Sequence, residues 1–311
     1  MVNEMADIQS IKNIGIIGRG AIGVNIAFNL QLAVNIKTTL LVRDNNDLNQ
    51  QLTLLDADGN THQINTPQQF LSQHALKQLD ILVIPVKQYQ IEALLQELAP
   101  ILSSQTAILL LHNGMGGIEL AQKYLPNNPL LVATTTDGVY KSAPTCFSQT
   151  AVGQFDIGIV DEEGRSDEGE HSDWEYLGYL HPNLRWRNDI VFALYQKVAV
   201  NAAINPLTAL KNCKNGELHN YHDDIKKIKE EIFDLYEFMN LPLDNHALSQ
   251  HIDAVILLTK DNYSSMHQDF RNGRETEVEG ILGFLLDKAK ETGMKMPLIQ
   301  TLYEQIKAGL K

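Results

Sequence analysis

The most constraining feature of the sequence is an apolar run that ends in a glycine-rich turn and continues as a helical pattern. Residues 12–18 form the apolar run, and residues 21–32 have helical character. The turn between them fits G-x-G-x-x-G, in which glycines permit a tight turn and close approach to a pyrophosphate, while the helix N-terminus supplies N–H groups. We therefore predict a dinucleotide-binding loop made of Gly18, Arg19, Gly20, Ala21, Ile22 and Gly23.

The rest of the first half alternates short apolar runs with helical patterns, whereas the second half is helical throughout. The apolar runs lie at 38–43, 81–85, 107–112 and 130–134, with helical patterns such as 91–98 and 117–124 between them. This alternation is typical of an α/β fold with a doubly wound parallel sheet. Four long helices are predicted after residue 180, at 189–211, 221–239, 244–260 and 274–292. We expect a Rossmann-type domain over residues 1–185 and an all-helical domain over residues 186–311.

Composition narrows the class of protein. A chain of 311 residues that is 44% hydrophobic can build two cores, and its net charge of −13 disfavours nucleic-acid or anionic-membrane partners. The acidic start lacks a signal-peptide pattern, so a cytoplasmic protein is expected. Cys146 and Cys213 have neither a CxxC partner nor a zinc-type histidine cluster, which predicts reduced thiols and no metal site. The acidic segment 161–175 is predicted to be a surface loop and is assigned no function.

A polar stripe runs along the helix predicted at 189–211. Lys197, Asn201 and Asn205 recur every fourth residue among valine, alanine, leucine and isoleucine, so they share one helical face. An unpaired buried amide costs roughly 1–3 kcal/mol, and an unpaired ammonium costs more. We therefore expect the three side chains to form hydrogen bonds with a neighbouring helix, with solvent or with a ligand.

Polar residues also follow the strands predicted in the first half. Arg43 and Asp44 come at the end of the second strand, where arginine suits the 2′-phosphate of NADP and an acidic residue suits the ribose of NAD. We favour NADP, because Arg43 continues directly from the strand. Lys87 and Asn113 follow the third and fourth strands, where loops beyond the carboxyl ends contact cofactor or substrate.

Taken together, these segments resemble the ketopantoate reductase (2-dehydropantoate 2-reductase) family. The resemblance covers nearly the whole chain and rests on these motifs: the glycine loop, the Lys87 loop, His112-Asn-Gly-Met115, Thr134-Thr-Thr136, Lys197-x3-Asn201-x3-Asn205-Pro-Leu-Thr-Ala, Asn215-Gly-Glu-Leu218, and Ser264-Ser-Met followed by Thr276-Glu277. It implies a Rossmann domain joined to a helical domain, and NADPH-dependent reduction of 2-dehydropantoate to (R)-pantoate on the way to pantothenate and coenzyme A. A small-molecule substrate and a monomer or homodimer are expected.

The resemblance also implies roles for individual residues. Lys197 corresponds to the general acid and Glu277 to the active-site carboxylate, expected close to Lys197 to keep it charged. The implied substrate-binding residues are Asn113, Asn201, Asn205, Asn262 and Ser265. Arg43 corresponds to the 2′-phosphate position, and Lys87 and Asn113 to positions near the nicotinamide. For Asp269, Arg271, Arg274 and Glu279, a solvated loop and a capped helix start are the preferred interpretation.

One departure from the family leaves the substrate open. Asp137 and Gly138 follow Thr134–Thr136, and an added carboxylate near the site could repel a 2-keto acid. The alternatives are therefore reduction of another branched 2-keto acid or of an opine-type imine with the same fold, and a non-catalytic NADP-binding sensor. A sensor needs only the glycine loop, so the polar residues of the helical half argue against it.

Overall fold

The computed structural model describes residues 11–167 and 172–310, and the chain divides into two compact units. The first comprises Met1–Val86, Gln90–His112 and Ile118–Ile190; the second comprises Lys87–Tyr89, Asn113–Gly117 and Val191–Lys311. The boundary predicted between residues 185 and 186 falls inside the strand β12 (Leu184–Trp186), which pairs with β11 (Phe155–Val160). The first unit therefore continues to Ile190, and two of its loops group with the helical unit.

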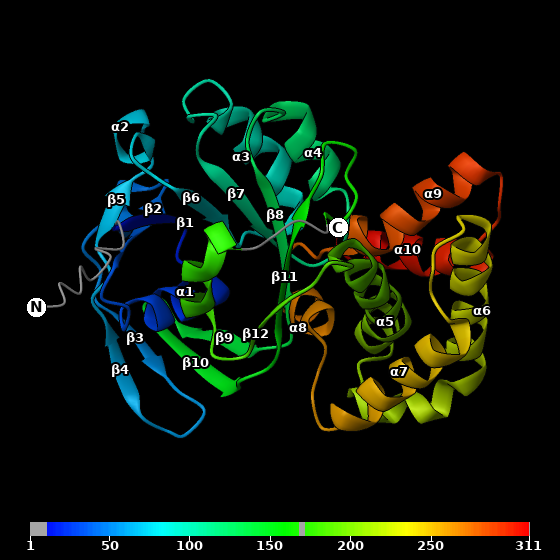
Figure 1. The fold of residues 1–311 in the computed structure, drawn as a ribbon. Coiled ribbons are helices and arrows are strands. Elements are labelled where there is room, and N and C mark those ends of the chain that lie inside the picture. The colour runs from blue at the N-terminus through cyan, green and yellow to red at the C-terminus, as the bar shows by residue number, and fades with distance from the viewer. Residues whose placement is uncertain (1–10, 168–171, 311) are drawn as a thin grey trace, which may run out of the picture. The chain divides into compact units, whose positions relative to one another are not determined.

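The first unit is built on an eight-stranded sheet (Figure 1). Its strand order is β12-β11-β8-β7-β6-β1-β2-β5, and its remaining strands are β1 (Lys12–Ile17), β2 (Ile36–Val42), β5 (Gln68–Phe70), β6 (Ile81–Ile84), β7 (Ala107–Leu111) and β8 (Leu130–Thr135). All pairs are parallel except β8 with β11. Every residue of β6 and β7 is buried, as expected for central strands covered on both faces. The predicted Rossmann-type fold is confirmed, with one antiparallel pair.

The helices of this unit follow the glycine turn and the next strands. They are α1 (Ala21–Leu30), α2 (Gln73–Leu76), α3 (Ile91–Leu98) and α4 (Gly117–Tyr124), with short 3-10 turns η1 (Asn45–Asp47), η2 (Gln88–Gln90, in the second unit except for its last residue) and η3 (Ser172–Leu180). Helix α3 packs one face against the core of the unit. The buried residues of this face recur at helical spacing: Ile91, Leu94, Leu95 and Leu98.

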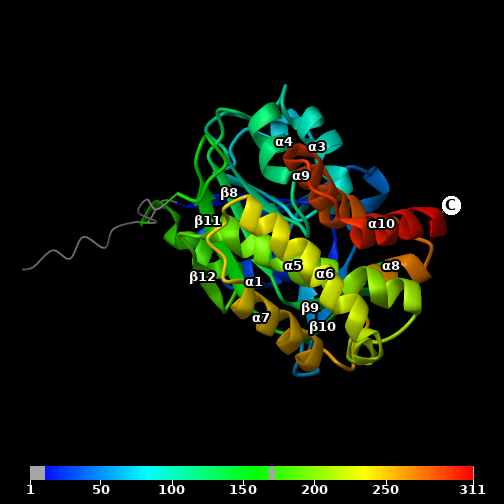
Figure 2. The same cartoon turned by 90° about the vertical axis from the view of Figure 1, so that its right-hand side faces the viewer.

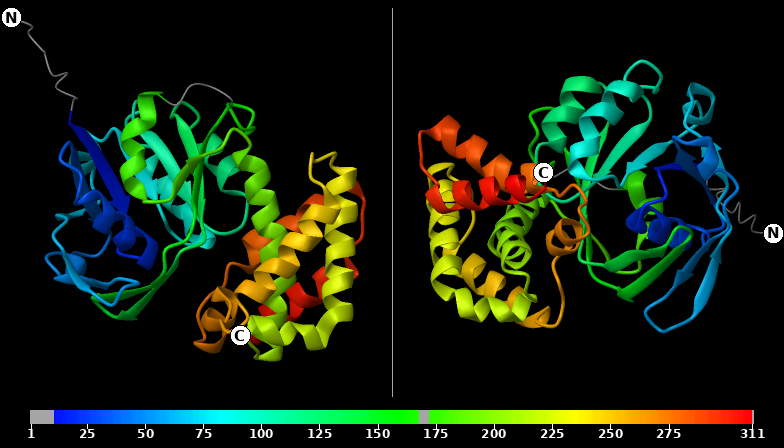
Figure 3. Two further views of the ribbon diagram at one scale, coloured as in Figure 1. Left: turned by 60° about the horizontal axis from the view of Figure 1, so that its bottom comes forward. Right: turned by 180° about the vertical axis from the view of Figure 1, so that it is seen from behind.

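A second sheet in this unit was not predicted from the sequence. It has the order β4-β3-β10-β9 and consists of β3 (Leu52–Leu55), β4 (Thr61–Ile64), β9 (Gly138–Ala143) and β10 (Cys146–Ala151). Helix α1 lies against it (Figure 3). Because β10 pairs in parallel with β3 from a distant part of the chain, no local pattern announces this pairing.

The second unit is helical, and Figure 2 shows its long helices from one side. They are α5 (Ile190–Lys211, of which the first residue still belongs to the first unit), α6 (His222–Phe238), α7 (Asn245–Leu258), α8 (Ser265–Arg271), α9 (Phe284–Thr292) and α10 (Pro297–Gly309), with the 3-10 turn η4 (Asn215–Tyr221) and the π-helix η5 (Glu279–Gly283). The carboxylate of Glu231 on α6 accepts the N–H groups of Leu298 and Ile299, which caps α10.

Three other expectations can be compared with the structure. The helix predicted over 274–292 is wrong in its first turn, because residues 274–277 are not helical and Glu277 precedes the π-helix. Cys146 and Cys213 are free thiols, as predicted. The segment 161–175 lies partly outside the described residues; within the described part, Asp161 accepts the N–H groups of Glu163 and Arg165 in a turn.

Helix α5 is the only helix in the described part of the chain that is long and apolar enough to cross a membrane. However, 78% of its most apolar window is buried inside the protein. Its apolar character is that of a core helix.

Candidate active site

The glycine loop in the first unit has the geometry of an anion-binding turn. Gly18 adopts φ +78°, which favours glycine, and its N–H donates to the carbonyl of Leu41 at 2.7 Å. A Cβ at Gly20 would meet only the carbonyl oxygen of Pro85, at 3.9 Å, so a bulky group can approach the backbone here. Among the described residues, no side chain caps the N-terminus of α1, which leaves its first N–H groups to a ligand. Arg19, Ala21 and Ile22 of this loop are half-buried.

The two charged residues that follow β2 have different surroundings. Arg43 follows the last strand residue, is exposed, and lies 3.9 Å from the Glu97 carboxylate. Asp44 instead accepts the N–H of Asn46 at 2.9 Å and so caps η1. The Asp44 carboxylate thus serves the local backbone, and the role of Arg43 at the 2′-phosphate stays a prediction.

A buried carboxylate organises the polar groups of the second unit. The side chain of Glu277 is 5% exposed and accepts from the Asn113 amide at 3.0 Å and from the Gln88 N–H at 3.3 Å. The same carboxylate lies 3.3 Å from the ammonium of Lys87. The loops that follow β6 and β7 therefore meet at Glu277, and the predicted contacts of Lys87 and Asn113 with cofactor or substrate stay predictions.

A second carboxylate shares Lys87. The ammonium of Lys87 lies 3.2 Å from Asp269 on α8, and Asp269 also accepts from Arg274 at 3.0 Å. Burial lowers the pKa of Lys87, but the charges of Glu277 and Asp269 outweigh it and raise the pKa, so Lys87 remains a cation at neutral pH. The predicted solvated role is wrong for Asp269, whose side chain is 13% exposed, whereas Arg274 is exposed as predicted. Spacing could have revealed Asp269, because it follows Ser265 by one helical turn.

A close backbone approach fixes the Asn113 turn. Gly114 has φ +87°, and a Cβ there would lie 2.5 Å from the carbonyl oxygen of Gly280. That carbonyl accepts the N–H of Met115 at 2.8 Å. Gly280 belongs to the π-helix η5, a geometry that occurs often at functional sites, and only Val278 separates Glu277 from this element.

The stripe on α5 is only partly buried. Asn205 is buried, whereas Lys197 and Asn201 are half-buried. Helix α8 is joined to α5 by the hydroxyls of Ser264 and Thr208, 2.7 Å apart. Ser264 also accepts the N–H of His267 and thereby caps α8, a structural role that the motif did not reveal.

The exposed residues at the start of α8 leave room for a ligand. The side chains of Ser265 and Asn262 are exposed, and the Asn262 carbonyl accepts the N–H of Asn215 at 2.9 Å. Their roles in substrate binding, and those of the α5 stripe, stay predictions. The expected proximity of Glu277 to Lys197 also stays a prediction, since the pairing described above is with Lys87.

Asp137 has a different environment from the one expected. Its side chain is 2% exposed, lies within the first unit, and accepts from His181 at 3.0 Å and from the Gly153 N–H at 2.7 Å. The expectation that this carboxylate faces and repels the substrate is wrong, because its oxygens are already engaged inside the fold.

Comparison with known proteins identifies the family. Residues 14–162 match the family described as "Ketopantoate reductase PanE/ApbA", and residues 189–310 match "Ketopantoate reductase PanE/ApbA C terminal". The chain belongs to the ketopantoate reductase family. The 2-dehydropantoate 2-reductase of Vibrio cholerae is 37% identical over 73% of this chain and 77% of its own length. That of Bacillus subtilis is 29% identical over 95% of this chain and 96% of its own.

Solved structures of the family and of related enzymes share the fold. A probable 2-dehydropantoate 2-reductase from Bacillus subtilis superposes with a TM-score of 0.79 at 28% identity, covering 96% of this chain and 99% of its own. D-mandelate dehydrogenase, solved with NADH and anilino(oxo)acetate, superposes with a TM-score of 0.84 at 22% identity and covers 96% of this chain and 98% of its own. D-mandelate dehydrogenase thus shares the fold of this chain.

The contact between Gly114 and Gly280 generates a testable difference in stability. Gly114→Ala should lower the free energy of unfolding by the left-handed backbone penalty, about 1–2 kcal/mol, plus about 1–3 kcal/mol for the clash with the Gly280 carbonyl. Gly59→Ala is the matched control, because Gly59 has φ +88° and open space around it, so it suffers the backbone penalty alone. Urea denaturation of both variants measures the difference. Equal losses would show that the ketopantoate reductase fold does not require this close approach.

Proposed function

We propose that the protein reduces 2-dehydropantoate to (R)-pantoate with NADPH, in the cytoplasm, as a step of pantothenate and coenzyme A biosynthesis. The observation that carries the proposal is the match to curated 2-dehydropantoate 2-reductases at 35–37% identity over about three quarters of the chain. The polar groups of the second unit support it, because a dinucleotide sensor would have no need of them.

The first unit fits the cofactor. The open backbone at Gly20, the uncapped start of α1 and the exposed Arg43 suit a pyrophosphate and a 2′-phosphate. The chemistry that a bound NADPH supplies is a hydride for C2 of the keto acid. We assign phosphate binding to the glycine loop and recognition of the 2′-phosphate to Arg43.

The second unit supplies the groups for the oxygen at C2. Reduction leaves negative charge on that oxygen, which a protonated amine can both stabilise and neutralise. We assign this role to Lys197 on α5, with Asn201, Asn205 and Ser265 donating hydrogen bonds that orient the carboxylate and the hydroxyl of the substrate.

We also assign a binding role to the cation of Lys87, which lies between two carboxylates in the second unit. The chain has a net charge of −13, which opposes binding of a 2-keto acid. Glu277 and Asp269 hold Lys87 in the protonated form, and the Lys87 side chain as a whole is 39% exposed. Lys87 thus offers a local positive charge to a carboxylate or to the nicotinamide end of the cofactor.

A second candidate is reduction of an aromatic or branched 2-keto acid. The structural similarity to D-mandelate dehydrogenase, which was solved with a 2-oxo acid bound, favours it. The two activities share the hydride transfer and the role of Lys197, and they differ in the side chain of the substrate. The terminal hydroxyl of 2-dehydropantoate therefore distinguishes them.

Steady-state oxidation of NADPH with 2-dehydropantoate, 2-ketoisovalerate and benzoylformate tests the proposal. We expect kcat/KM for 2-dehydropantoate to exceed the others by about 10³-fold or more, because a site built to bind a hydroxyl rejects substrates that lack it. Comparable values for 2-ketoisovalerate would reject the pantoate assignment and leave the reductase. NADPH binding without turnover on any of the three would support the sensor instead.

Replacing Lys197 tests the general acid. Lys197→Ala should reduce kcat by about 10²–10⁴-fold with little change in the Kd for NADPH, since the lost interaction develops in the transition state. Lys211→Ala removes an exposed lysine from the same helix and should leave kcat unchanged. Stopped-flow and steady-state rates measure the effect. If the Lys197 variant turns over within a few-fold of the parent, Lys197 is not the general acid and the polar stripe on α5 has a structural role.

Replacing Arg43 tests the choice of cofactor. Arg43→Ala should raise the KM for NADPH by about tenfold, equivalent to about 1.4 kcal/mol, and leave the KM for NADH nearly unchanged. Glu97→Gln removes the carboxylate that lies 3.9 Å from Arg43 and should leave the KM for NADPH unchanged or lower it. Equal use of NADPH and NADH by the parent protein would instead assign the ribose site to Asp44.

A further inference from the structure

The first unit contains a buried polar network apart from the site described above. Asn25, Gln149 and His181 are buried, and the side chain of Asp137 is 2% exposed. The Asn25 amide donates to Asp137 at 3.1 Å, and the Asn25 oxygen accepts from Gln149 at 3.1 Å. A buried network of this kind is costly unless each donor meets an acceptor, so its arrangement is specific.

Hydrogen bonding fixes the protonation of the network. The N–H of Asn183 donates to Nδ1 of His181 at 3.0 Å, so Nδ1 is an acceptor and Nε2 carries the proton that points to Asp137. Burial raises the pKa of Asp137, but the bonds from His181 and Gly153 outweigh it and lower the pKa, so this group is a carboxylate. One oxygen accepts from His181 and Gly153, and the other accepts from Asn25.

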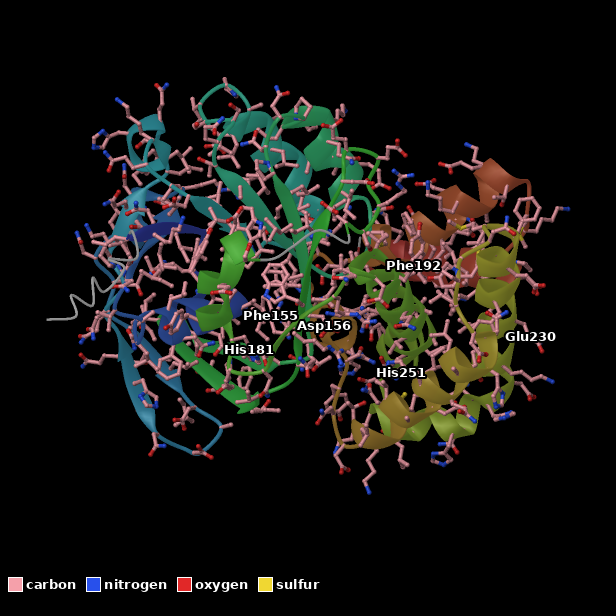
Figure 4. All side chains as sticks on the ribbon, in the orientation of Figure 1. Phe155, Asp156, His181, Phe192, Glu230 and His251 are labelled. Carbon is pink, nitrogen blue, oxygen red and sulfur yellow. The ribbon has the colours of Figure 1, made fainter. Side chains whose placement is uncertain are left out.

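The network reaches the helix that begins at the glycine loop. Asn25 and Asn29 lie one turn apart on α1, and the Asn29 amide donates to the carbonyl of Leu180, next to His181, at 2.8 Å. The ring of His181 stacks on Phe155, with centroids 5.6 Å apart (Figure 4). One face of α1 is therefore held by directional polar bonds, which fix its position along its axis more strictly than apolar packing does.

We propose that Asp137 is a positioning residue for dinucleotide binding: through Asn25 it holds α1, and with it the glycine loop from Gly18 to Gly23, in the geometry that receives the pyrophosphate. The inference rests on the proposed function, because it assigns the network to NADPH binding. It assigns the carboxylate of Asp137 a role in the cofactor site and none in substrate binding.

A swap of the two bonded residues tests the proposal. Asp137→Asn turns an amide toward the Asn25 amide, and Asn25→Asp places two carboxylates 3.1 Å apart. Each single variant should raise the Kd for NADPH by about tenfold and leave kcat at saturating NADPH within about twofold. The double variant restores one donor and one acceptor, and an acceptor for Gln149, so its Kd should return to within about threefold of the parent.

Titration of protein fluorescence with NADPH and a thermal melt are recorded for each variant. Asp161→Asn is the control, because Asp161 accepts two backbone N–H groups and an arginine in the same unit away from α1, and its Kd should not change. A lower Tm with an unchanged Kd in the single variants, or a folded double variant that still binds tenfold more weakly, would overturn the proposal. If the single variants do not fold, the Kd of the double variant for NADPH alone tests the proposal.

Parent binding separates this inference from the proposed function. If the parent protein does not bind NADPH, the proposed function fails and the inference fails with it. If the parent binds NADPH and the single variants bind equally well, only the positioning role of Asp137 is rejected.

Discussion

The second unit depends on the buried carboxylate of Glu277. Its oxygens receive the ammonium of Lys87, the amide of Asn113 and the backbone N–H of Gln88, which come from two loops far away in the sequence. Glu277 is buried, so loss of these partners would leave its charge uncompensated. Glu277 therefore joins the loops that follow β6 and β7 to the rest of the second unit, together with Asp269 and the Gly280 carbonyl.

A backbone contact within the second unit also holds the loop of Asn113 in place. The backbones of Gly114 and Gly280 approach so closely that a Cβ at Gly114 would clash with the Gly280 carbonyl. The N–H of Met115 donates a hydrogen bond to the same carbonyl. The π-helix widens the turn shortly after Glu277 and presents the Gly280 carbonyl to the loop. A charged contact and a backbone contact thus hold the loop of Asn113 from two sides, which pre-organises a polar group that we assign to binding.

We assign anion binding to different groups in the two units. In the first unit it is assigned to the backbone of the glycine loop and of the start of α1, while Asp137 bonds Asn25 in the middle of that helix. In the second unit it is assigned to side chains, and Glu277 and Asp269 keep Lys87 cationic in a protein whose net charge is −13. Local pairing therefore keeps Lys87 protonated in a protein whose overall composition is acidic.

The sequence by itself determined the parts of the structure that depend on near neighbours. The glycine loop, the alternation of strands and helices, and the stripe of Lys197, Asn201 and Asn205 all follow from residues within one or two turns of each other, because turn chemistry and periodicity are local. The placement of Lys87 and Asn113 after strands also predicted that they belong to a site.

Tertiary structure decided which distant groups meet. The sheet formed by β3 and β10, the pairing of Asp269 with Lys87, and the burial of Asp137 beside His181 all join segments far apart in the chain. Residue type and spacing state that a carboxylate needs a partner, but not which partner, since that depends on how the chain brings the segments together. For this reason Asp137 resembled a charge facing a substrate in the sequence and is an engaged structural carboxylate in the fold.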